Sequence, residues 1–543
     1  MNQAQVAVVT GGARGIGFAI ASALAGGGYH VVIVDSGVQL DGGRAAPGPA
    51  QEAVRLLAGQ GGSAQAVACD VADASQVRAA FAGLEERLGR VDVLVNVAGI
   101  LRPGPFLTDT RQTWDAVVGT HLSGHINTIG AVLPGMLARG SGRIINFSST
   151  AALLGSRRQP AYSTAKEAVV GLSRRLGSLL ASSGVSVNVV SPGAATRMSA
   201  GLRAAGDEHL AQRMPELHDR DAAHVGRFVS WLCGSRAAGM TGKLFLTSGN
   251  YVIEYEHLRL WKWAMVAAGS SAPRPGHAQL EEYLRWVIGR PHPTLIGPWP
   301  TRDFGLAAVE RLREGTSIGP DLTRAPRSPA SGAALALGLP GERSGSLLEH
   351  LDDVVTAAGT AGQDPAARAP GAVVFAPDVP APMPAPAAGA VALPDPGAAR
   401  TAVTDLLGLV RSAIEATAHH DDRGVVVVFP GGLPWLDQEA SLARWVAWYA
   451  AVGLVRGGAA TEGLYGVRVN GLVPGPGHAR LAGPLARYLL SPASAWLNGY
   501  VLTADERGIG LLSDENPRWQ AFASGDGWGL PDALLANLSD YRV

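Results

Sequence analysis

The chain has 543 residues, of which 47% are hydrophobic, and its 45 basic and 45 acidic residues give a formal net charge of zero. This length and apolar content predict two domains of about 250 residues each rather than one. A net charge of zero gives no electrostatic reason to expect nucleic acid or an anionic membrane as a partner.

Cysteine and lysine are both rare. The two cysteines, Cys69 and Cys233, are too few and too far apart in sequence to predict a disulfide framework or a metal site. The sequence shows no signal peptide and no apolar run long enough to span a membrane, so we expect a soluble cytoplasmic protein. Lys166, Lys243 and Lys262 are the only lysines among the 45 basic residues.

The N-terminal segment predicts a dinucleotide site. Residues Gln5–Val9 form a short apolar run typical of a strand, and a glycine-rich turn then leads into a helical run that ends at Gly26. Glycines in such a turn let the backbone approach a pyrophosphate, whose charge is stabilised at a helix N-terminus. The residues expected to bind the cofactor here are Gly11, Arg14, Gly15, Ile16 and Gly17.

The second predicted strand, His30–Val34, is followed directly by Asp35. A carboxylate at this place can accept hydrogen bonds from both ribose hydroxyls of NAD, and it would repel the 2′-phosphate of NADP. Arg14 favours the opposite choice, because its guanidinium could pair with that phosphate. We expect NAD as the cofactor, with NADP as the alternative.

Two further predicted strands, Ala64–Ala68 and Val91–Val95, alternate with helical segments. The first ends at Asp70-Val71, and the second leads into the turn Asn96-Val97-Ala98-Gly99. Strands that alternate with helices predict an α/β fold whose parallel, doubly wound sheet binds its ligand at the carboxyl ends of the strands.

The candidate chemistry lies where a predicted strand, Arg143–Phe147, leads through a serine loop into a predicted helix, Ala165–Leu180. Tyr162 and Lys166 are four residues apart, so at the start of that helix they lie on one face. A tyrosine hydroxyl has a pKa of about 10 and transfers protons poorly at neutral pH unless a nearby cation favours the phenolate. We expect Ser149 to orient a carbonyl or alcohol oxygen, Tyr162 to transfer the proton and Lys166 to lower the tyrosine pKa.

A serine thirteen residues before a Tyr-x-x-x-Lys pair, together with the N-terminal glycine fingerprint, resembles the short-chain dehydrogenase/reductase family over residues 4–262. The sequence AGILR at Ala98–Arg102 and the Pro-x-x-x-Thr-Arg-Met pattern at Pro192–Met198 resemble one branch more closely. That branch comprises the D-3-hydroxyacyl-CoA dehydrogenase part of peroxisomal multifunctional enzyme type 2 and related actinobacterial dehydrogenases.

The resemblance implies further cofactor contacts. It places Asp70 and Val71 against adenine, and it implies that Val97, which replaces an asparagine of the family turn, costs one side-chain contact. It also implies that Lys166 binds ribose while it assists the tyrosine. The residues that the resemblance adds to the cofactor site are Asp70, Val71, Asn96, Ala98, Gly99, Tyr162, Lys166, Pro192, Gly193 and Thr196.

One expected catalytic position departs from the family pattern. Many members carry an asparagine that holds a proton-relay water near the catalytic lysine, and His121 occupies that position here. Either His121 only bonds to the backbone, or it replaces the asparagine in the relay. The resemblance also implies that residues 198–221 form a mobile helical lid that selects the substrate. Residues 242–246 would be the last strand of the first sheet.

The second half of the chain repeats the first without its chemistry. Residues 425–429, 451–456 and 467–475 match residues of the first half at one constant offset of 282. At that offset Ser149, Tyr162 and Lys166 correspond to Gly431, Arg444 and Trp448. Near the expected first strand, residues 295–305 keep a trace of strand, turn and helix, but Trp, Pro and Asp stand where a pyrophosphate would approach.

We therefore predict two Rossmann-like domains in tandem, the second of them degenerate. Residues 1–265 would be the catalytic domain, 266–300 a connector with one helix, and 301–543 a pseudo-domain that binds no nucleotide. The pseudo-domain is expected to pack on the first domain as a built-in partner, and a further homodimer remains open.

The expected activity is an NAD(P)-dependent interconversion of a secondary alcohol and a ketone, with a 3-hydroxyacyl or 3-ketoacyl thioester as one substrate class. A tailoring ketoreductase for a polyketide-like metabolite, a redox-neutral cyclase or epimerase, and a non-catalytic NAD-binding protein are the alternatives.

Overall fold

The computed structural model describes the chain in segments, most completely in its first half. The described residues are 4–37, 48–104, 109–156, 158–194, 221–248, 251–255, 259–265, 278–281, 284, 334–337, 355–357, 371–376, 391–416, 423–429, 433–434, 437, 440–462, 467–475, 481–491, 494, 497–505, 508–513 and 517–518.

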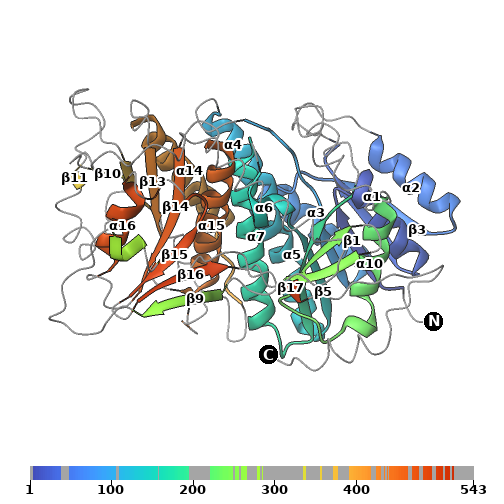
Figure 1. Ribbon diagram of the computed structural model, residues 1–543. Coiled ribbons are helices and arrows are strands. Elements are labelled where there is room, and N and C mark those ends of the chain that lie inside the picture. The colour runs from blue at the N-terminus through green and yellow to red at the C-terminus, as the bar shows by residue number, and fades with distance from the viewer. Residues whose placement is uncertain are drawn as a thin grey trace.

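Two sheets lie side by side with helices between them (Figure 1). The described strands of the first sheet follow the order β3-β2-β1-β4-β5-β6-β7-β8-β17. Its mutually parallel strands are β1 (Val6–Thr10), β2 (His30–Asp35), β3 (Ser63–Ala68), β4 (Val93–Asn96), β5 (Gly142–Phe147), β6 (Val185–Pro192) and β7 (Leu244–Ser248). These strands are short apolar runs because most of them are covered by helices on both faces. The predicted α/β fold class is confirmed.

The strand expected at residues 242–246 is present as β7, but the expectation that it is the last strand of the first sheet is wrong. Strand β8 (Tyr251–Tyr255) pairs antiparallel with β7, and β17 (Pro517–Arg518) pairs antiparallel with β8. The sheet therefore continues past β7 because the chain reverses and then receives a strand from its far end.

Helices cover both faces of the first sheet. One face packs on α1 (Gly15–Gly26), α2 (Pro49–Gly59) and α10 (Ala222–Cys233), whose apolar residues share one core. The opposite face packs on α3 (Ala74–Leu88), α4 (Arg111–Val118), α5 (Gly124–Arg139) and α7 (Pro160–Leu179). A π-helical turn, η1 (Gly119–Ser123), joins α4 to α5. Such turns are frequent at functional sites.

The described strands of the second sheet follow the order β11-β10-β12-β13-β14-β15-β16-β9. They are β9 (Arg259–Met265), β10 (Ala334–Leu337), β11 (Val355–Ala357), β12 (Gly371–Phe375), β13 (Arg423–Val428), β14 (Val467–Pro474), β15 (Val501–Ala504) and β16 (Gly508–Ser513). One face carries α14 (Pro396–Ala416) and α15 (Leu442–Glu462), and the other carries α16 (Ala482–Leu490). Residues 295–305, expected to hold a degenerate fingerprint, lie outside the described part of the chain.

The two halves of the sequence exchange edge strands. Strand β9 comes from the first half but pairs antiparallel with β16 of the second sheet. Strand β17, near the end of the chain, pairs antiparallel with β8 of the first sheet. Each sheet thus receives its last strand from the other half, and the expected division at residue 265 falls directly after a strand of the second sheet.

Helices α7 and α15 lie against each other between the sheets (Figure 1). An added Cβ at Gly171 would lie 2.7 Å from both the Trp445 carbonyl oxygen and the Tyr449 Cβ. An added Cβ at Gly453 would lie 2.6 Å from the Ser163 carbonyl oxygen and 2.7 Å from the Glu167 Cβ. Each of these residues has its counterpart 282 positions away, so the contact has the pseudo-twofold form of a symmetric dimer.

Apolar packing is continuous across this contact. Val169 and Leu172 of α7 belong to the same buried cluster as Val446 and Val452 of α15. At its edges Arg111 pairs with Asp405, with 2.6 Å between guanidinium and carboxylate. The two halves are therefore joined through a buried core and not only through the polypeptide connection.

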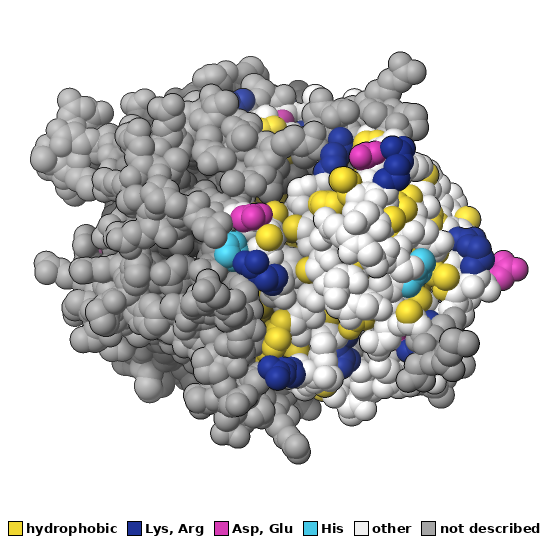
Figure 2. Space-filling view, turned by 90° about the vertical axis from the view of Figure 1, so that its right-hand side faces the viewer, with side chains coloured by type: hydrophobic (Ala, Val, Ile, Leu, Met, Phe, Trp, Pro, Cys, Tyr) yellow, Lys and Arg dark blue, Asp and Glu magenta, His cyan; other side chains and the backbone are white. Residues whose placement is uncertain are grey.

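Figure 2 shows the end of the first domain that faces away from the second sheet. On the described part of this face, basic and acidic side chains lie singly or in small groups among apolar and uncharged ones. Among the described helices, none combines the length and the apolar character that a membrane span requires.

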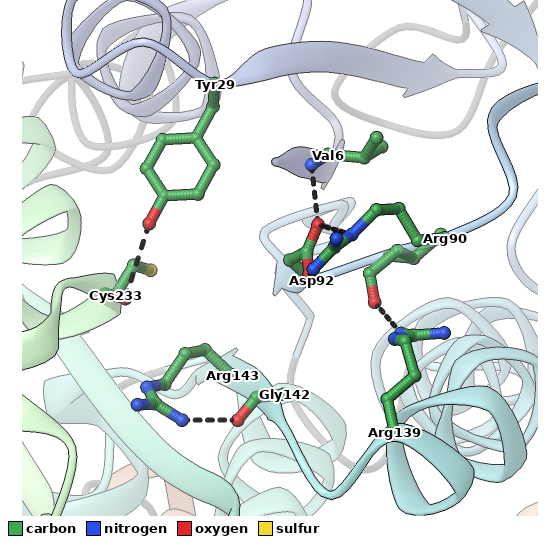
Figure 3. Close-up of polar contacts among 9 residues, drawn as sticks. Val6, Tyr29, Arg90, Asp92, Arg139, Gly142, Arg143 and Cys233 are labelled. Atoms are coloured by element: carbon green, nitrogen blue, oxygen red, sulfur yellow. Dashed lines mark hydrogen bonds and ion pairs between the residues drawn. The ribbon is translucent and has the colours of Figure 1, made fainter. Parts of the chain in front are cut away.

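A polar cluster fixes the amino ends of the central strands (Figure 3). The Asp92 carboxylate accepts a hydrogen bond from the Val6 amide at 2.8 Å and is paired with the Arg90 guanidinium. Nearby, Arg139 of α5 donates to the Val91 carbonyl oxygen at 2.6 Å. This edge lies opposite the carboxyl ends of the strands, where open α/β sheets bind their ligands.

Candidate active site

A cavity of about 770 Å³ lies at the carboxyl ends of the parallel strands of the first sheet. Strands β1 and β4 are neighbours in the sheet although β2 and β3 come between them in sequence. The strands after β1 are therefore added on one side of it, and the strands from β4 onward are added on the other side. Ligands of open α/β sheets bind at such a switch point. The segments that line the cavity follow β1, β2, β3, β4, β5 and β6 in turn.

The turn after β1 forms a glycine cradle at the N-terminus of α1. Gly11 and Gly15 have φ angles of +65° and +55°, which residues with a side chain adopt rarely. A Cβ at Gly11 would lie 2.8 Å from the Ala98 Cα, and a Cβ at Gly17 would collide with the Gly11 carbonyl oxygen. At Gly15, no described atom lies within 4 Å of an added Cβ. The open space beside a helix N-terminus suits the pyrophosphate of a dinucleotide.

Asp35 lines the cavity at the end of β2. Its carboxylate accepts hydrogen bonds from the Gly37 amide at 2.8 Å and from the Ala13 amide at 3.3 Å. The first of these bonds holds the loop after β2, and the second ties Asp35 to the glycine turn. These contacts fix a negative charge next to the cradle, where a ribose would follow the pyrophosphate.

The loops after β3 and β4 form the next part of the wall. Asp70 and Val71 line the cavity, and the Val71 carbonyl oxygen accepts a hydrogen bond from Asn127 of α5 at 2.9 Å. After β4, the Val97 and Ala98 amides donate to the Thr10 hydroxyl at 3.1 and 3.2 Å. The turn therefore keeps its shape through its backbone although Val97 has no polar side chain.

Tyr162 and Lys166 both line the cavity from the first turns of α7, which begins with Pro160 at its first position. The Tyr162 hydroxyl forms a hydrogen bond with Ser149, which caps the short helix α6 (Thr150–Leu154). Lys166 donates from Nζ to the Phe147 carbonyl oxygen at 2.7 Å, and this Nζ lies 5.9 Å from the centre of the Tyr162 ring. The serine, tyrosine and lysine are thus brought together at one end of the cavity.

A series of hydrogen bonds between buried polar side chains connects α7 to the sheet. Thr128 donates to Asn96 at 2.8 Å, Asn96 donates to Asn146 at 3.0 Å, and Asn146 donates to Ser173 of α7 at 2.9 Å. This series links α5, β4, β5 and α7, so it fixes the helix that carries the tyrosine and lysine against the strand that leads to the serine.

Burial controls the proton affinities of this site. It lowers the pKa of Lys166 from 10.5 to about 7, because the charged ammonium is removed from water. It raises the pKa of Tyr162, and the hydrogen bond from Ser149 opposes that change. Desolvation therefore disfavours the charged form of both side chains, and the expected lowering of the tyrosine pKa by Lys166 stays a prediction.

His121 lies in the π-helical turn with 1% of its surface exposed, and its ring meets that of Tyr162 edge to face at 5.0 Å. Its Nε2 is 2.8 Å from the Ile100 carbonyl oxygen, so Nε2 carries the hydrogen and Nδ1 is an acceptor. Burial and the nearby Lys166 hold the pKa of His121 well below 6.5. Among the described residues Nδ1 has no hydrogen-bond partner, so a neutral acceptor is left beside the tyrosine.

Most of the expected catalytic and cofactor residues line this cavity, and three described ones do not. The Asn96 side chain is used in the buried series of hydrogen bonds, Gly193 donates its amide to the Thr247 carbonyl oxygen, and Ser149 reaches the site only through Tyr162. Thr196 and the expected lid at residues 198–221, apart from its last residue, lie outside the described part of the chain. The expected residues that line the cavity are Gly11, Arg14, Gly15, Ile16, Gly17, Asp35, Asp70, Val71, Ala98, Gly99, His121, Tyr162, Lys166 and Pro192.

Several lining residues had no signal in the sequence. They come from α4, from the π-helical turn η1, from the turn after β4 and, in one case, from the second half of the chain. A helix face that lines a cavity has the same sequence pattern as a polar helix face exposed to solvent. A contact between the two halves of the chain leaves no pattern in the local sequence. These residues are Arg102, Gln112, Asp115, Ala116, Thr120 and Arg400.

The corresponding place in the second half is filled. Trp448, which corresponds to Lys166, is fully buried and packs on Phe429 with ring centres 4.9 Å apart. Arg444, which corresponds to Tyr162, pairs with Asp437 at 2.6 Å. Gly431 lies outside the described residues. An ion pair therefore replaces the tyrosine of the first half, and an aromatic core replaces its lysine.

Comparison with known proteins covers the first half of the chain. The family model described as short chain dehydrogenase matches residues 5–206. The chain is 43% identical to the short-chain reductase protein NovJ of Streptomyces niveus, over 36% of this chain and 70% of that protein. It is 38% identical to the 3-oxoacyl-[acyl-carrier-protein] reductase of a Synechocystis species, over 46% of this chain and 98% of that protein.

Among solved structures, the chain is similar to an actinorhodin polyketide ketoreductase determined with NADPH. The two sequences are 32% identical, and the match covers 46% of this chain and 98% of the ketoreductase with a TM-score of 0.43.

Proposed function

The chain belongs to the short-chain dehydrogenase family, and on this premise we propose that it reduces a ketone to a secondary alcohol with NADH. The observation that carries the proposal is the grouping of Ser149, Tyr162 and Lys166 at one end of a cavity whose middle is the glycine cradle. A nicotinamide dinucleotide bound along this cavity supplies the hydride.

Each of the three residues has a separate task. Tyr162 gives its hydroxyl proton to the oxygen of the carbonyl group as that oxygen becomes an alcohol. Ser149, already hydrogen-bonded to this hydroxyl, orients the same oxygen. Lys166 returns a proton toward the tyrosine, and its pKa of about 7 lets it exchange protons near neutral pH. The free Nδ1 of His121 accepts a hydrogen bond in this relay, in the role that an asparagine has in many family members.

NAD is proposed over NADP because of Asp35. Its carboxylate is fixed by the Gly37 and Ala13 amides and faces the cavity beside the cradle. A 2′-phosphate on the ribose would bring negative charge next to this carboxylate, which is unfavourable unless a cation offsets it. Arg14 also lines the cavity and is the residue through which NADP would be accommodated.

A 3-oxoacyl thioester is the substrate class that we propose. The support is the likeness to a 3-oxoacyl-[acyl-carrier-protein] reductase over nearly all of that protein's length, together with the sequence resemblance to D-3-hydroxyacyl-CoA dehydrogenases. In the proposed reaction, a 3-oxoacyl thioester, NADH and one proton give a 3-hydroxyacyl thioester and NAD⁺. The keto carbon gains the hydride and its oxygen gains the proton.

The second half is proposed to be a non-catalytic partner. Its counterparts of the tyrosine and lysine are held in an ion pair and an aromatic core. Its helix α15 covers the apolar face of α7, the helix that carries Tyr162 and Lys166. In this view the chain contains within itself the contact that two subunits would otherwise make.

A direct test measures oxidation of NADH and of NADPH with 3-oxoacyl thioesters on coenzyme A, on a short pantetheine analogue and on a carrier protein. We expect turnover with at least one thioester and a higher kcat/KM with NADH than with NADPH. If simple ketones are reduced but none of the thioesters is, the proposed substrate class is contradicted. If kcat/KM is equal for NADH and NADPH, the role proposed for Asp35 is contradicted.

A further inference from the structure

One residue from the second half lines the cavity of the first. Arg400 lies in the second turn of α14, and its side chain is half-buried. An added Cβ at Gly119 would lie 3.5 Å from both Cδ and Nη1 of Arg400 and 3.9 Å from the Ala72 Cβ. Arg400 thus meets the first domain where the π-helical turn approaches the loop after β3.

This place borders the loop after β3. Ala72 follows Asp70 and Val71 at the end of β3, the outermost strand on this side of the sheet. Tyr162 lies beside β5, on the other side of β1 and β4. A dinucleotide with its pyrophosphate on the glycine cradle and its nicotinamide at Tyr162 would extend its adenosine half past Asp35 toward Ala72.

Helix α14 is anchored on both sides of Arg400 by contacts that do not use its guanidinium. Two contacts bracket it on α14: Ser123 donates to the Pro396 carbonyl oxygen at 2.7 Å, and Arg111 pairs with Asp405 at 2.6 Å. Asp115, the carboxylate of the nearby cavity wall, lies 3.7 Å from Arg111. In the described part of the chain Arg400 itself makes no hydrogen bond or ion pair, so its donors and its planar face are available to a ligand.

We propose that Arg400 contacts the adenine of the bound dinucleotide, which makes the second half a part of the cofactor site. A guanidinium stacks on aromatic rings and donates hydrogen bonds in its own plane, and both contacts suit a purine at the mouth of a cavity. The proposal rests on the proposed function, because it requires a dinucleotide in the cavity. According to this proposal, the second half contributes to the cofactor site although it has lost its own catalytic residues.

The test compares cofactor affinity in full-length variants. Arg400→Met keeps the length of the side chain and removes its charge and donors, and Arg400→Lys keeps the charge but loses the planar group. Arg87→Ala, on the exposed last turn of α3, removes an arginine that does not line the cavity and serves as the control. Titration calorimetry with NADH, NADPH, ADP-ribose and nicotinamide mononucleotide reports binding without turnover.

We expect Arg400→Met to weaken NADH and ADP-ribose about tenfold, the size of a partly desolvated cation–π contact, and to leave the mononucleotide unchanged. The NADH affinity of Arg400→Lys should lie between those of Arg400→Met and the unmodified protein, and the affinity of Arg87→Ala should equal that of the unmodified protein. Equal NADH affinity in Arg400→Met and the unmodified protein would overturn the proposal, as would a loss confined to NADPH, which would assign the arginine to a 2′-phosphate. If the unmodified protein binds neither NADH nor NADPH, the proposed function fails before this inference is reached.

Discussion

Helices α7 and α15 approach each other so closely that the addition of one methyl group between them should push them apart. In Gly453→Ala the added Cβ would lie 2.6 Å from the Ser163 carbonyl oxygen and 2.7 Å from the Glu167 Cβ. Ordinary contacts begin at 3.4 Å, so the helices must move apart by the difference, roughly 0.8 Å, at this point. The nearest atom is backbone and cannot rotate away.

The size of the effect follows from two opposing terms. Overpacking a filled interior costs about 1–3 kcal/mol, and a backbone clash belongs at the upper end of that range. Replacing glycine by alanine inside a helix contributes about 1 kcal/mol in favour of folding. We therefore expect a net loss of about 1–2 kcal/mol in the free energy of unfolding.

The assay is equilibrium urea unfolding of full-length protein, followed by circular dichroism. Gly408→Ala on α14 is the matched control, because no described atom outside its own helix lies within 4 Å of an added Cβ there, and it should stabilise by up to about 1 kcal/mol. Gly171→Ala should repeat the loss from the other side of the contact, since Trp445 and Tyr449 lie 2.7 Å from its Cβ. An unchanged or higher midpoint in both interface variants would refute the close packing of the two halves.

Three further predictions follow from the cofactor site and from the contact between halves. Asp35→Ala should relax or reverse the preference for NADH over NADPH, measured as the ratio of the two kcat/KM values. An unaltered ratio would show that Asp35 does not determine which cofactor is preferred. The pKa of Lys166 is about 7 in the folded protein and 10.5 in the unfolded chain. The unfolded state therefore binds more protons between these values, and cofactor-free stability should rise with pH from about 7 toward 9, by at most about 1.4 kcal/mol per pH unit. Lys166→Met should abolish this rise, and an equal slope in both proteins would contradict the prediction. Truncation after residue 265 removes α15 and β17, so the fragment should self-associate or precipitate during gel filtration, and a soluble, fully active monomer would show that the second half is dispensable.

The sequence predicted the first sheet and much of its site, because the relevant signals are local. Strands β1, β2 and β4 are continuous apolar runs of the kind that a strand covered on both faces requires. The spacing of Tyr162 and Lys166 places them one turn apart on any helix, and the structure shows them together at the cavity. The duplicated pattern at the offset of 282 likewise appears as equivalent strands and helices in the second sheet.

What the sequence could not predict depends on contacts between distant segments. The exchange of β9 and β17 is a choice of strand partners that no local pattern specifies. Arg400 reaches the cavity only because α14 packs against α4, so nothing in its own neighbourhood indicates a ligand. Burial raises the pKa of Tyr162, and the depth of that burial is a property of the folded site that no local sequence pattern specifies.

The central claim is that the tyrosine at the cavity transfers the proton in a nicotinamide-dependent reduction. Tyr162→Phe removes only the hydroxyl, so NADH affinity measured by calorimetry should change little while kcat for a 3-oxoacyl thioester falls by at least a hundredfold, as expected for loss of a general acid. A fall in kcat of less than tenfold, with cofactor binding intact, corresponds to under about 1.4 kcal/mol of barrier and would contradict the account.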